Sequence, residues 1–242
     1  MTANEHFLRH FPNFNRSRYL WRYMDLRKLR LLLESSSIWF SRADRFDDTF
    51  EGAISDATRK VVTYRPDVTT EMIEEFNRIH LWWKQWTNIS CWQLADGENA
   101  LMWQAYAKDG AAICTIFERL SAALPSIALL SPVFYKDFSR EIVPDGTQMR
   151  YFVKRHQFSS ESEVRALIIN APADDSGLND LTKSNPDAGL NVPVDLSTLL
   201  ECVVTRPYAS DADRAEVVEL IKSIGHSIPV QTSELSGQPR WN

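Results

Sequence analysis

The stretch Ser36-Ser-Ile-Trp-Phe-Ser-Arg-Ala-Asp-Arg-Phe-Asp-Asp-Thr-Phe-Glu-Gly52 turns from an apolar run into a charged turn. Its β-prone residues, Ile38 to Phe40, predict a buried strand, and three aspartates and two arginines follow at once. A strand that opens into a charged turn can hold reactive side chains at the rim of a rigid core. We therefore expect polar groups from several segments to meet at a cleft here. Asp47 and Asp48 either cap the turn or form a charged lip of that cleft.

The composition sets the broad class of the protein. With 242 residues, 44% of them hydrophobic, the chain can bury a sizeable core, and we expect one domain over residues 1–242. The net charge of −5 argues against extensive coating of nucleic acid. It does not decide whether the protein has a local basic patch. Three widely spaced cysteines without C-x-x-C spacing predict neither a zinc site nor a disulfide framework. The first residues carry charge and no long apolar run, which predicts a cytoplasmic protein without a membrane partner.

Periodicity along the chain predicts an α+β fold, with a mixed, partly parallel central sheet flanked by helices. Residues 1–16 are expected to be an irregular or helical lead-in, and residues 170–193 a long loop or insertion. We expect helices at 25–34, 51–63, 68–86, 99–107, 118–124 and 146–157, and strands at 38–40, 89–92, 110–117, 127–135 and 162–169. Residues 199–234 predict a C-terminal βαβ unit with strands at 201–206 and 227–232 and a helix at 210–224.

A basic and aromatic segment lies between Arg16 and Arg30, where six Lys and Arg residues are opposed only by Asp25. One interpretation is a solvated basic helix face. The other is an anion site, in which Arg22 and Tyr23 at the end of a strand meet phosphate. His6 and His10 lie one helical turn apart, but no acidic or cysteine ligand lies near them, so we predict no metal there.

The strand at 162–169 carries the most suggestive chemical groups. A period of two places Glu161, Glu163 and Arg165 on one face, which we expect to be a polar wall. Cleavage of a nicotinamide–ribose bond passes through an oxocarbenium-like state, which a nearby carboxylate stabilises. The alternative is a surface ladder, in which Glu163 pairs with Arg165 or Lys154.

The helix expected at 99–107 contains Met102, Trp103 and Tyr106 at helical spacing. Such a set is typical of a core, but Trp103 and Tyr106 could also stack on a nicotinamide, an adenine or a nucleobase. The glycines form neither a G-x-G-x-x-G nor a Walker loop, and no G-x-S-x-G elbow occurs. His80 and His156 are expected to be packed or surface residues. A metal nuclease would need a Glu-x-Lys after Asp47 and Asp48, and that motif does not follow them.

Several segments together resemble the bacterial family catalogued as domain of unknown function 2971. The matching segments are Tyr19–Tyr23, Ile38–Glu51, Ile89–Trp92, Leu101–Tyr106, Phe158–Arg165 and Leu199–Pro207. The chain departs from the family where Asn-Asp-Pro is usual, since it has Asp47-Asp48-Thr49. The resemblance implies no established activity. Members of the family are similar to components found near phage-defence genes, which implies a role in defence.

A looser resemblance links the chain to the ADP-ribosyltransferase layout. That layout has an aromatic and arginine-containing strand, a short helix, a strand ending in Phe-Ser, and a late strand with Glu-x-Glu. The resemblance implies that Arg22 or Tyr23 contacts the diphosphate or adenosine of NAD and that Ser41 supports the site. It also implies that Glu163 is the catalytic carboxylate and Glu161 its upstream partner. The C-terminal βαβ unit is not part of the layout.

Three hypotheses for the function follow. The first is an NAD-consuming ADP-ribosyltransferase-like or NAD-glycohydrolase-like effector with NAD as co-substrate, no metal, and an acceptor that the sequence does not name. The second is a non-catalytic module that binds a nucleotide or a phage component, and the third is a metal-dependent nuclease using Asp47, Asp48 and Glu163. The candidate site residues of the first are Glu161 and Glu163 for catalysis, and Arg22, Tyr23, Ser41, Asp47, Asp48, Trp103, Tyr106, Lys154 and Arg165 for substrate binding.

Overall fold

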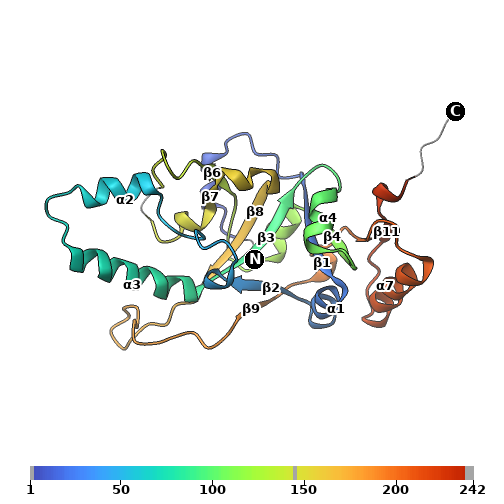
Figure 1. Cartoon of the computed structure of the whole chain (residues 1–242). Coiled ribbons are helices and arrows are strands. Elements are labelled where there is room, and N and C mark those ends of the chain that lie inside the picture. Colours follow the sequence, from blue (N-terminus) through green and yellow to red (C-terminus); the bar gives the residue numbers. More distant parts are fainter. Residues whose placement is uncertain (1–2, 144–145, 238–242) are drawn as a thin grey trace. The chain divides into compact units, whose positions relative to one another are not determined.

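The computed structural model describes residues 3–143 and 146–237. The fold is α+β, with a mixed, partly parallel central sheet flanked by helices, which confirms the predicted fold class (Figure 1). The chain divides into two compact units. The first unit contains residues 1–38, 91–130 and 191–242, and the second contains residues 39–90 and 131–190. The single domain expected from the sequence stays a prediction.

The first unit is built on strand β1 (Tyr19–Asp25). Along its whole length β1 pairs antiparallel with β4 (Gly110–Ile116), from Tyr19 opposite Ile116 to Asp25 opposite Gly110. On its other edge β1 pairs antiparallel with the second half of β3 (Thr87–Leu94). Strand β10 (Cys202–Thr205) continues the sheet antiparallel to β4, and β11 (Val230–Thr232) then runs parallel to β10.

The predicted C-terminal βαβ unit is confirmed, since helix α7 (Asp211–Ser223) connects the parallel strands β10 and β11 and packs against both (Figure 1). Ser210 begins α7 with a capping box, in which its side chain accepts from Asp213 N and the Asp213 carboxylate accepts from Ser210 N. Gly225 follows the helix with a φ of 75°, a conformation that suits glycine. The second strand is shorter than predicted, because it begins at Val230.

Local capping explains where the other helices of the first unit begin. Asp25 accepts from Lys28 N at 2.7 Å and starts α1 (Leu26–Ser35), which buries Leu29, Leu32 and Leu33. Asn99 caps α4 (Ala100–Tyr106) in the same way. The remaining elements are η1 (His6–His10), α5 (Phe117–Ala123), α6 (Leu196–Leu199) and η5 (Glu234–Ser236). Within the segment expected to be an irregular or helical lead-in, η1 is helical and buries Phe7.

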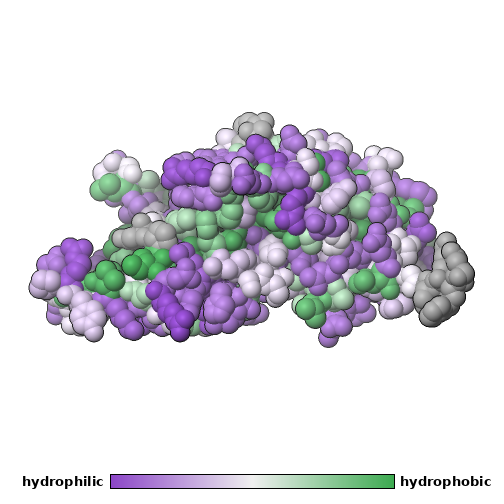
Figure 2. All heavy atoms as spheres, turned by 90° about the horizontal axis from the view of Figure 1, so that it is seen from above, coloured by the Kyte–Doolittle hydropathy of each residue, from purple (hydrophilic) through white to green (hydrophobic). Residues whose placement is uncertain are grey.

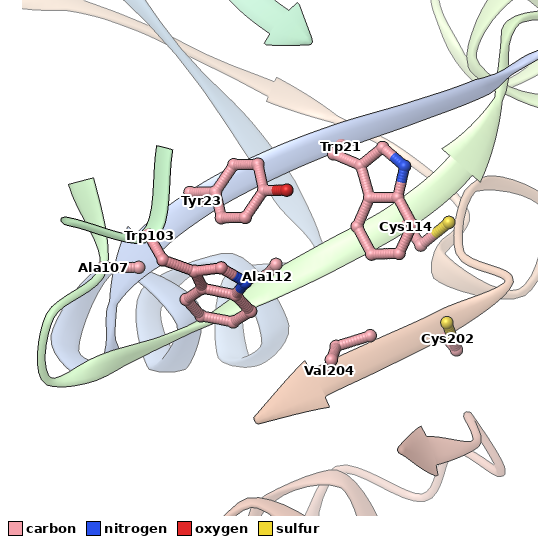
Figure 3. Packing of buried hydrophobic residues seen from close by; sticks show 8 residues of the cluster. All are labelled: Trp21, Tyr23, Trp103, Ala107, Ala112, Cys114, Cys202 and Val204. Atoms are coloured by element: carbon pink, nitrogen blue, oxygen red, sulfur yellow. The ribbon is translucent and has the colours of Figure 1, made fainter. Parts of the chain in front are cut away.

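An aromatic cluster forms much of the core of the first unit (Figure 3). It joins side chains from β1, α4, β4 and β10, namely Trp21, Tyr23, Trp103, Ala107, Ala112, Cys114, Cys202 and Val204. Tyr23 and Trp103 meet edge to face, with ring centroids 5.0 Å apart. Cys114 and Cys202 lie opposite each other on neighbouring strands and are both free thiols.

The second unit contains most of the stretch that the sequence singled out, from Trp39 onwards. Strand β2 (Ser37–Arg42) pairs antiparallel with the first half of β3, with Ser41 opposite Ile89. The turn η2 (Ala43–Arg45) follows, as expected of a strand that opens into a charged turn. The other strands are β5 (Leu129–Pro132), β6 (Phe134–Lys136), β7 (Val153–Arg155), β8 (Glu163–Ile169) and β9 (Gly189–Pro193), of which β5 and β9 cross the boundary between the units.

The prediction of a helix at 146–157 was wrong. In the described part of that range, Met149–Phe152 form the short 3-10 helix η3, and β7 follows, paired parallel with β6. The 3-10 helix η4 (His156–Glu161) then leads to Ser162, which has a left-handed φ of 43°. The strand expected at 127–135 is interrupted into β5 and β6. Pairing with a distant strand, which periodicity does not reveal, decides the conformation of β7.

Arg42 ties the long loop of residues 170–193 to the second unit. Its buried guanidinium holds Asp44 at 2.5 and 2.9 Å and donates to the backbone oxygens of Asn185 and Asp187. Apart from β9, which occupies its last residues, the loop contains no helix or extended strand, in agreement with the prediction. Helices α2 (Asp56–Thr63) and α3 (Thr70–Trp86) complete this unit. Among the described residues, no helix is long and apolar enough to cross a membrane.

His80 on α3 is a packed residue, as predicted. Its Nδ1 lies 2.9 Å from Arg150 Nη1, and because a guanidinium only donates, Nδ1 must be the unprotonated acceptor. Burial, together with the positive charges of Arg150 and Lys84, lowers the pKa of His80 to about 4. The folded protein therefore holds His80 neutral at neutral pH.

The neutral state of His80 predicts an acid-sensitive contribution to stability. The folded pKa of about 4 lies below the unfolded value of 6.5, so protons bind more tightly to the unfolded chain. The contribution is fully present above pH 6.5 and is lost as the pH falls towards 4. We expect the free energy of unfolding of His80→Asn to fall less over this pH range than that of the wild type, measured by urea denaturation. The matched control is the exposed His156→Asn, which should keep the wild-type slope; equal slopes for all three proteins would contradict the prediction.

Candidate functional site

A buried cluster of charged side chains surrounds the start of β8 in the second unit. At its centre is Arg165, whose side chain is 0% exposed. The Arg165 guanidinium binds both carboxylate oxygens of Glu51, at 2.6 and 2.9 Å, and donates to the backbone oxygen of Tyr151 at 2.6 Å. Its Nε donates to Glu163 Oε2, also at 2.6 Å. Two carboxylates thus share one guanidinium in a setting without water access, where charge-assisted bonds are strong.

Lys154 connects the buried Glu163 to Glu161, which lies nearer the surface. Its ammonium lies 2.6 Å from Glu163 Oε1 and 2.5 Å from Glu161 Oε2, so it bridges the two glutamates. The Lys154 side chain is 9% exposed, whereas that of Glu161 is 20% exposed. Lys154 comes from β7 and Glu161 from the end of η4, and Phe158 of η4 lies under the ammonium at 4.7 Å. Glu161 is therefore the acidic group of the cluster that a solute reaches most easily.

The cluster contains more carboxyl groups than cations, which determines where a proton is held. Three carboxyl groups (Glu51, Glu161 and Glu163) face two cations (Lys154 and Arg165), so one carboxyl group in excess is not neutralised. Ionisation of a third carboxylate beside the other two is opposed by repulsion and by burial. The least tightly held carboxyl group, that of Glu161, is the one expected to keep a proton near neutral pH.

The pKa values of the two glutamates bridged by Lys154 agree with that expectation. Burial and the neighbouring Glu163 carboxylate together raise the pKa of Glu161 to about 7, although Lys154 acts in the opposite direction. Burial also raises the pKa of Glu51, although Arg165 acts against that rise. Burial also disfavours ionisation of Glu163, but Arg165, Glu161 and Lys154 outweigh it and hold the pKa of Glu163 well below its usual range. Burial lowers and the two glutamates raise the pKa of Lys154, with a net rise, so the ammonium stays charged. The two carboxyl groups titrate as a pair with very different affinities for a proton.

A second ion pair with aromatic neighbours joins Arg155 of β7 to Asp48 in the turn that follows η2. Asp48 accepts from Arg155 at 2.8 Å and from Phe50 N at 3.0 Å. The Arg155 guanidinium lies 4.3 Å from the ring centre of Phe50 and 5.3 Å from that of Phe158. Asp48 thus caps the turn and is also a charged group beside aromatic rings, while Asp47 is exposed.

The sequence placed Glu161 on the wrong element. Strand β8 begins at Glu163, so Glu161 belongs to η4 and does not share a strand face with Glu163 and Arg165. The expected polar wall is also wrong, because Glu163 is 8% and Arg165 0% exposed and both faces of β8 are buried. The ion pairing named as the alternative, between Glu163 and Arg165 or Lys154, does occur, with both partners and inside the protein.

The other candidate residues are distributed over both units. Ser41 lies on β2 of the second unit, opposite Ile89. Arg22, Tyr23, Trp103 and Tyr106 belong to the first unit. Glu161, Glu163, Lys154 and Arg165 are the set that the structure brings together. That these residues converge with the aromatic and basic segment of β1 stays a prediction.

Within the first unit, Tyr23 and Trp103 are core residues (Figure 3). Tyr23 OH accepts from Asn99 N at 2.9 Å, and Trp103 Nε1 donates to Glu98 at 2.8 Å. This geometry supports the core interpretation of Trp103, whose ring is 3% exposed, whereas Tyr106 is 52% exposed. The Arg22 guanidinium lies 5.7 Å from the ring centre of Trp92, and burial lowers its pKa to about 10.

Two members of the cluster were missed from the sequence. Glu51 ends the opening stretch, next to Gly52, whose positive φ of 67° turns the chain there. A glutamate next to a glycine, at the end of a short strand and a charged turn, is a sequence signal that could have identified Glu51. Tyr135 OH accepts from Glu163 N at 2.8 Å, and no local pattern indicates that contact.

Comparison with known proteins gave no match to a family model, a curated protein or a solved structure. The chemistry of the cluster must therefore be argued from its own geometry. In the part of the chain that the structure describes, no group of three or more His, Cys, Asp and Glu side chains could hold a metal ion. The arrangement offers an ionised carboxylate, a carboxyl group that gains or loses a proton near neutral pH, and a fixed ammonium between them.

Proposed function

We propose that the chain is an enzyme that cleaves the glycosidic bond of a nucleotide, with the nicotinamide–ribose bond of NAD as its substrate bond. The observation that carries the proposal is the glutamate pair bridged by Lys154, in which the pKa of Glu161 is raised to about 7 and that of Glu163 is lowered. A carboxyl group with a pKa near the working pH is suited to general acid–base catalysis. Two carboxyl groups whose pKa values are driven apart are typical of glycosidic bond cleavage.

The geometry assigns the reactive role to Glu161. Both oxygens of Glu163 are occupied, Oε1 by Lys154 and Oε2 by Arg165, so this carboxylate has little left to offer a ribose. Glu161 is half-buried and accessible, and its pKa of about 7 lies near neutral pH. Its carboxylate can stabilise the positive charge that develops on the ribose and take a proton from the attacking water or acceptor hydroxyl. Glu163 is then a positioning residue, which holds Lys154 and raises the pKa of Glu161.

These roles exchange those expected from the ADP-ribosyltransferase layout, in which Glu163 was the catalytic carboxylate. The acceptor of the ADP-ribose is whichever group approaches Glu161, either water or a second molecule. The assay below distinguishes hydrolysis from transfer only through its products. A role in phage defence and membership of the family named above stay predictions from the resemblance, and the proposal does not depend on them.

The test is NAD turnover by the whole chain, measured as release of nicotinamide, with NAD binding measured in parallel by calorimetry. We expect Glu161→Gln to lower kcat by about 10²-fold or more while the thermal unfolding temperature changes little, because removal of a positioned acid–base group costs about that much. Glu74→Gln, on the exposed part of α3, is the matched control and should keep wild-type activity.

The outcomes separate the three hypotheses. Absence of turnover by folded wild-type protein would refute the proposal, and saturable binding of NAD without turnover would favour a binding module instead. Turnover that Glu161→Gln leaves unchanged would remove Glu161 from the mechanism. The rate of the wild type should also rise with pH through about 7, as the base form of Glu161 becomes populated.

A further inference from the structure

Residues 56–81 form a helical arm, consisting of α2, the connection 64–69 and the first part of α3, with many apolar side chains exposed. Val61 is 57%, Tyr64 85% and Met72 54% exposed. Val62, Phe76 and Leu81 are also at least 39% exposed. In Figure 2 the surface over α2 carries apolar residues between polar ones. Soluble proteins seldom leave so many large apolar side chains grouped in water unless another surface covers them.

The apolar side chains of α3 form a stripe. Met72, Phe76 and Ile79 recur every four or three residues, and Ile73 precedes Phe76 by three, which places all four on one side of the helix. Further along α3 the same face carries Trp83, which is half-buried. In the arm, the Arg150 guanidinium lies 5.6 Å from the ring centre of Phe76, but Met72 is 54% and Phe76 40% exposed. The stripe therefore extends beyond what the described part of the unit covers. Leu81 differs, because its helical position lies on the opposite, charged side of α3.

The two helices of the arm carry charges of opposite sign beside their apolar side chains. In α2, Arg59 and Lys60 precede Val61 and Val62, and Asp56 is the only acidic residue of the helix. In α3, Glu71 and Glu75 are one turn apart and flank the side of the stripe that contains Met72. Arg78 binds Glu75 at 2.6 Å, so the arm part of α3 has an acidic excess of three glutamates over one arginine. The basic helix of one arm is therefore complementary to the acidic helix of another arm.

We propose that the arm is a dimerisation surface, and that the occupant of its apolar face is the arm of a second copy of this chain. A two-fold axis repeats each contact, so α2 of one copy meets α3 of the other twice. In each repeat, the apolar side chains are buried between a basic helix and an acidic helix. The apolar contact supplies the attraction, and the opposite charges fix the orientation of the two arms. A partner of one uniform charge would match only one of the two helices. The arm contains none of the residues of the glutamate cluster, so this proposal does not rest on the proposed function.

The first test measures the mass in solution, by sedimentation or light scattering, at about 100 µM chain, well above the micromolar range of weak complexes. Wild-type protein should have twice the chain mass of 27.9 kDa. Val61→Asp/Met72→Asp should raise the dissociation constant by about 100-fold or more, because it buries two unpaired charges in the interface. Leu81→Asp is the matched control, since Leu81 is 60% exposed but lies off the stripe, and it should stay dimeric.

The second test uses charge reversal and does not depend on apolar contacts. Arg59→Glu/Lys60→Glu gives an arm with two acidic helices, and Glu71→Lys/Glu75→Lys gives an arm with two basic helices. Each variant alone should be monomeric, and an equimolar mixture should form a heterodimer. A monomeric wild type, a dimer that survives Val61→Asp/Met72→Asp, dissociation by Leu81→Asp, or a mixture that stays monomeric would each overturn the proposal. Thermal unfolding of every variant verifies that it is folded.

Discussion

Replacing Arg165 by methionine should lower the free energy of unfolding by about 3–5 kcal/mol, the cost of breaking a buried ion pair by removing one partner. Methionine keeps much of the volume of the arginine stem, so a cavity contributes little to the loss. The cost arises from Glu51, which is 2% exposed and whose two oxygens both bind the guanidinium. Without Arg165, the Glu51 carboxylate is either an unpaired buried charge or must take up a proton.

The effect can be measured by urea denaturation, with Arg140→Met as the matched control, since the Arg140 side chain is 85% exposed and its pair with Asp137 is long, at 3.8 Å. Surface pairs of this kind contribute little, so the control should stay within about 0.5 kcal/mol of wild type. Adding Glu51→Gln to Arg165→Met should restore part of the loss, because the stranded charge is then absent. A double variant no more stable than Arg165→Met would contradict this account of the cluster.

The pH dependence of Arg165→Met provides an independent check. An unpaired buried carboxylate has a folded pKa above its unfolded value, so protonation stabilises the folded state. The difference in stability between wild type and Arg165→Met should therefore be largest near neutral pH and become smaller as the pH falls through the raised pKa of Glu51. A difference that does not change with pH would indicate lost packing and not lost charge pairing.

Much of the fold was predictable because its signals are local. Asp25 and Ser210 begin helices at the positions that their capping chemistry indicates, and the C-terminal βαβ unit follows from a strand, a capped helix and a second strand in short succession. The alternation from Ser162 to Ile169 correctly predicted a strand, which begins one residue later, at Glu163. In each case the residues that decide the conformation lie within a few positions of one another.

The missed features depend on contacts over long distances in the sequence. The burial of Arg165 follows from Glu51, 114 residues earlier, and from the backbone of Tyr151. A single strand cannot show that its charged face is inside the protein when the compensating charges lie elsewhere. Similarly, Val153–Arg155 became a strand by pairing with β6, although its neighbours resemble a helix in composition. The candidate site could thus be predicted as a set of residues, but its burial and its protonation states could not.

Gly110 should be the least replaceable glycine of the first unit, and Gly110→Ala should lower the free energy of unfolding by about 3 kcal/mol or more. A Cβ at this position would lie 1.9 Å from the carbonyl oxygen of Met24 and 2.9 Å from Cα of Asp25. These are backbone atoms of β1, which pairs with β4 at this point, so no side chain can rotate away to make room. The strands would have to separate at the end of the longest pairing in the unit.

The matched control is Gly97→Ala, because a Cβ there meets nothing within 4 Å and the backbone conformation is open to alanine. That substitution removes freedom from the unfolded chain alone and should be neutral or stabilise the protein by up to about 1 kcal/mol. Hydrogen exchange locates the effect of Gly110→Ala, since protection should fall first in Met24 and Ala111, next to the clash, if the strands separate there. Equal stability of the two alanine variants would show that β1 and β4 do not approach as closely at Gly110 as the structure has them.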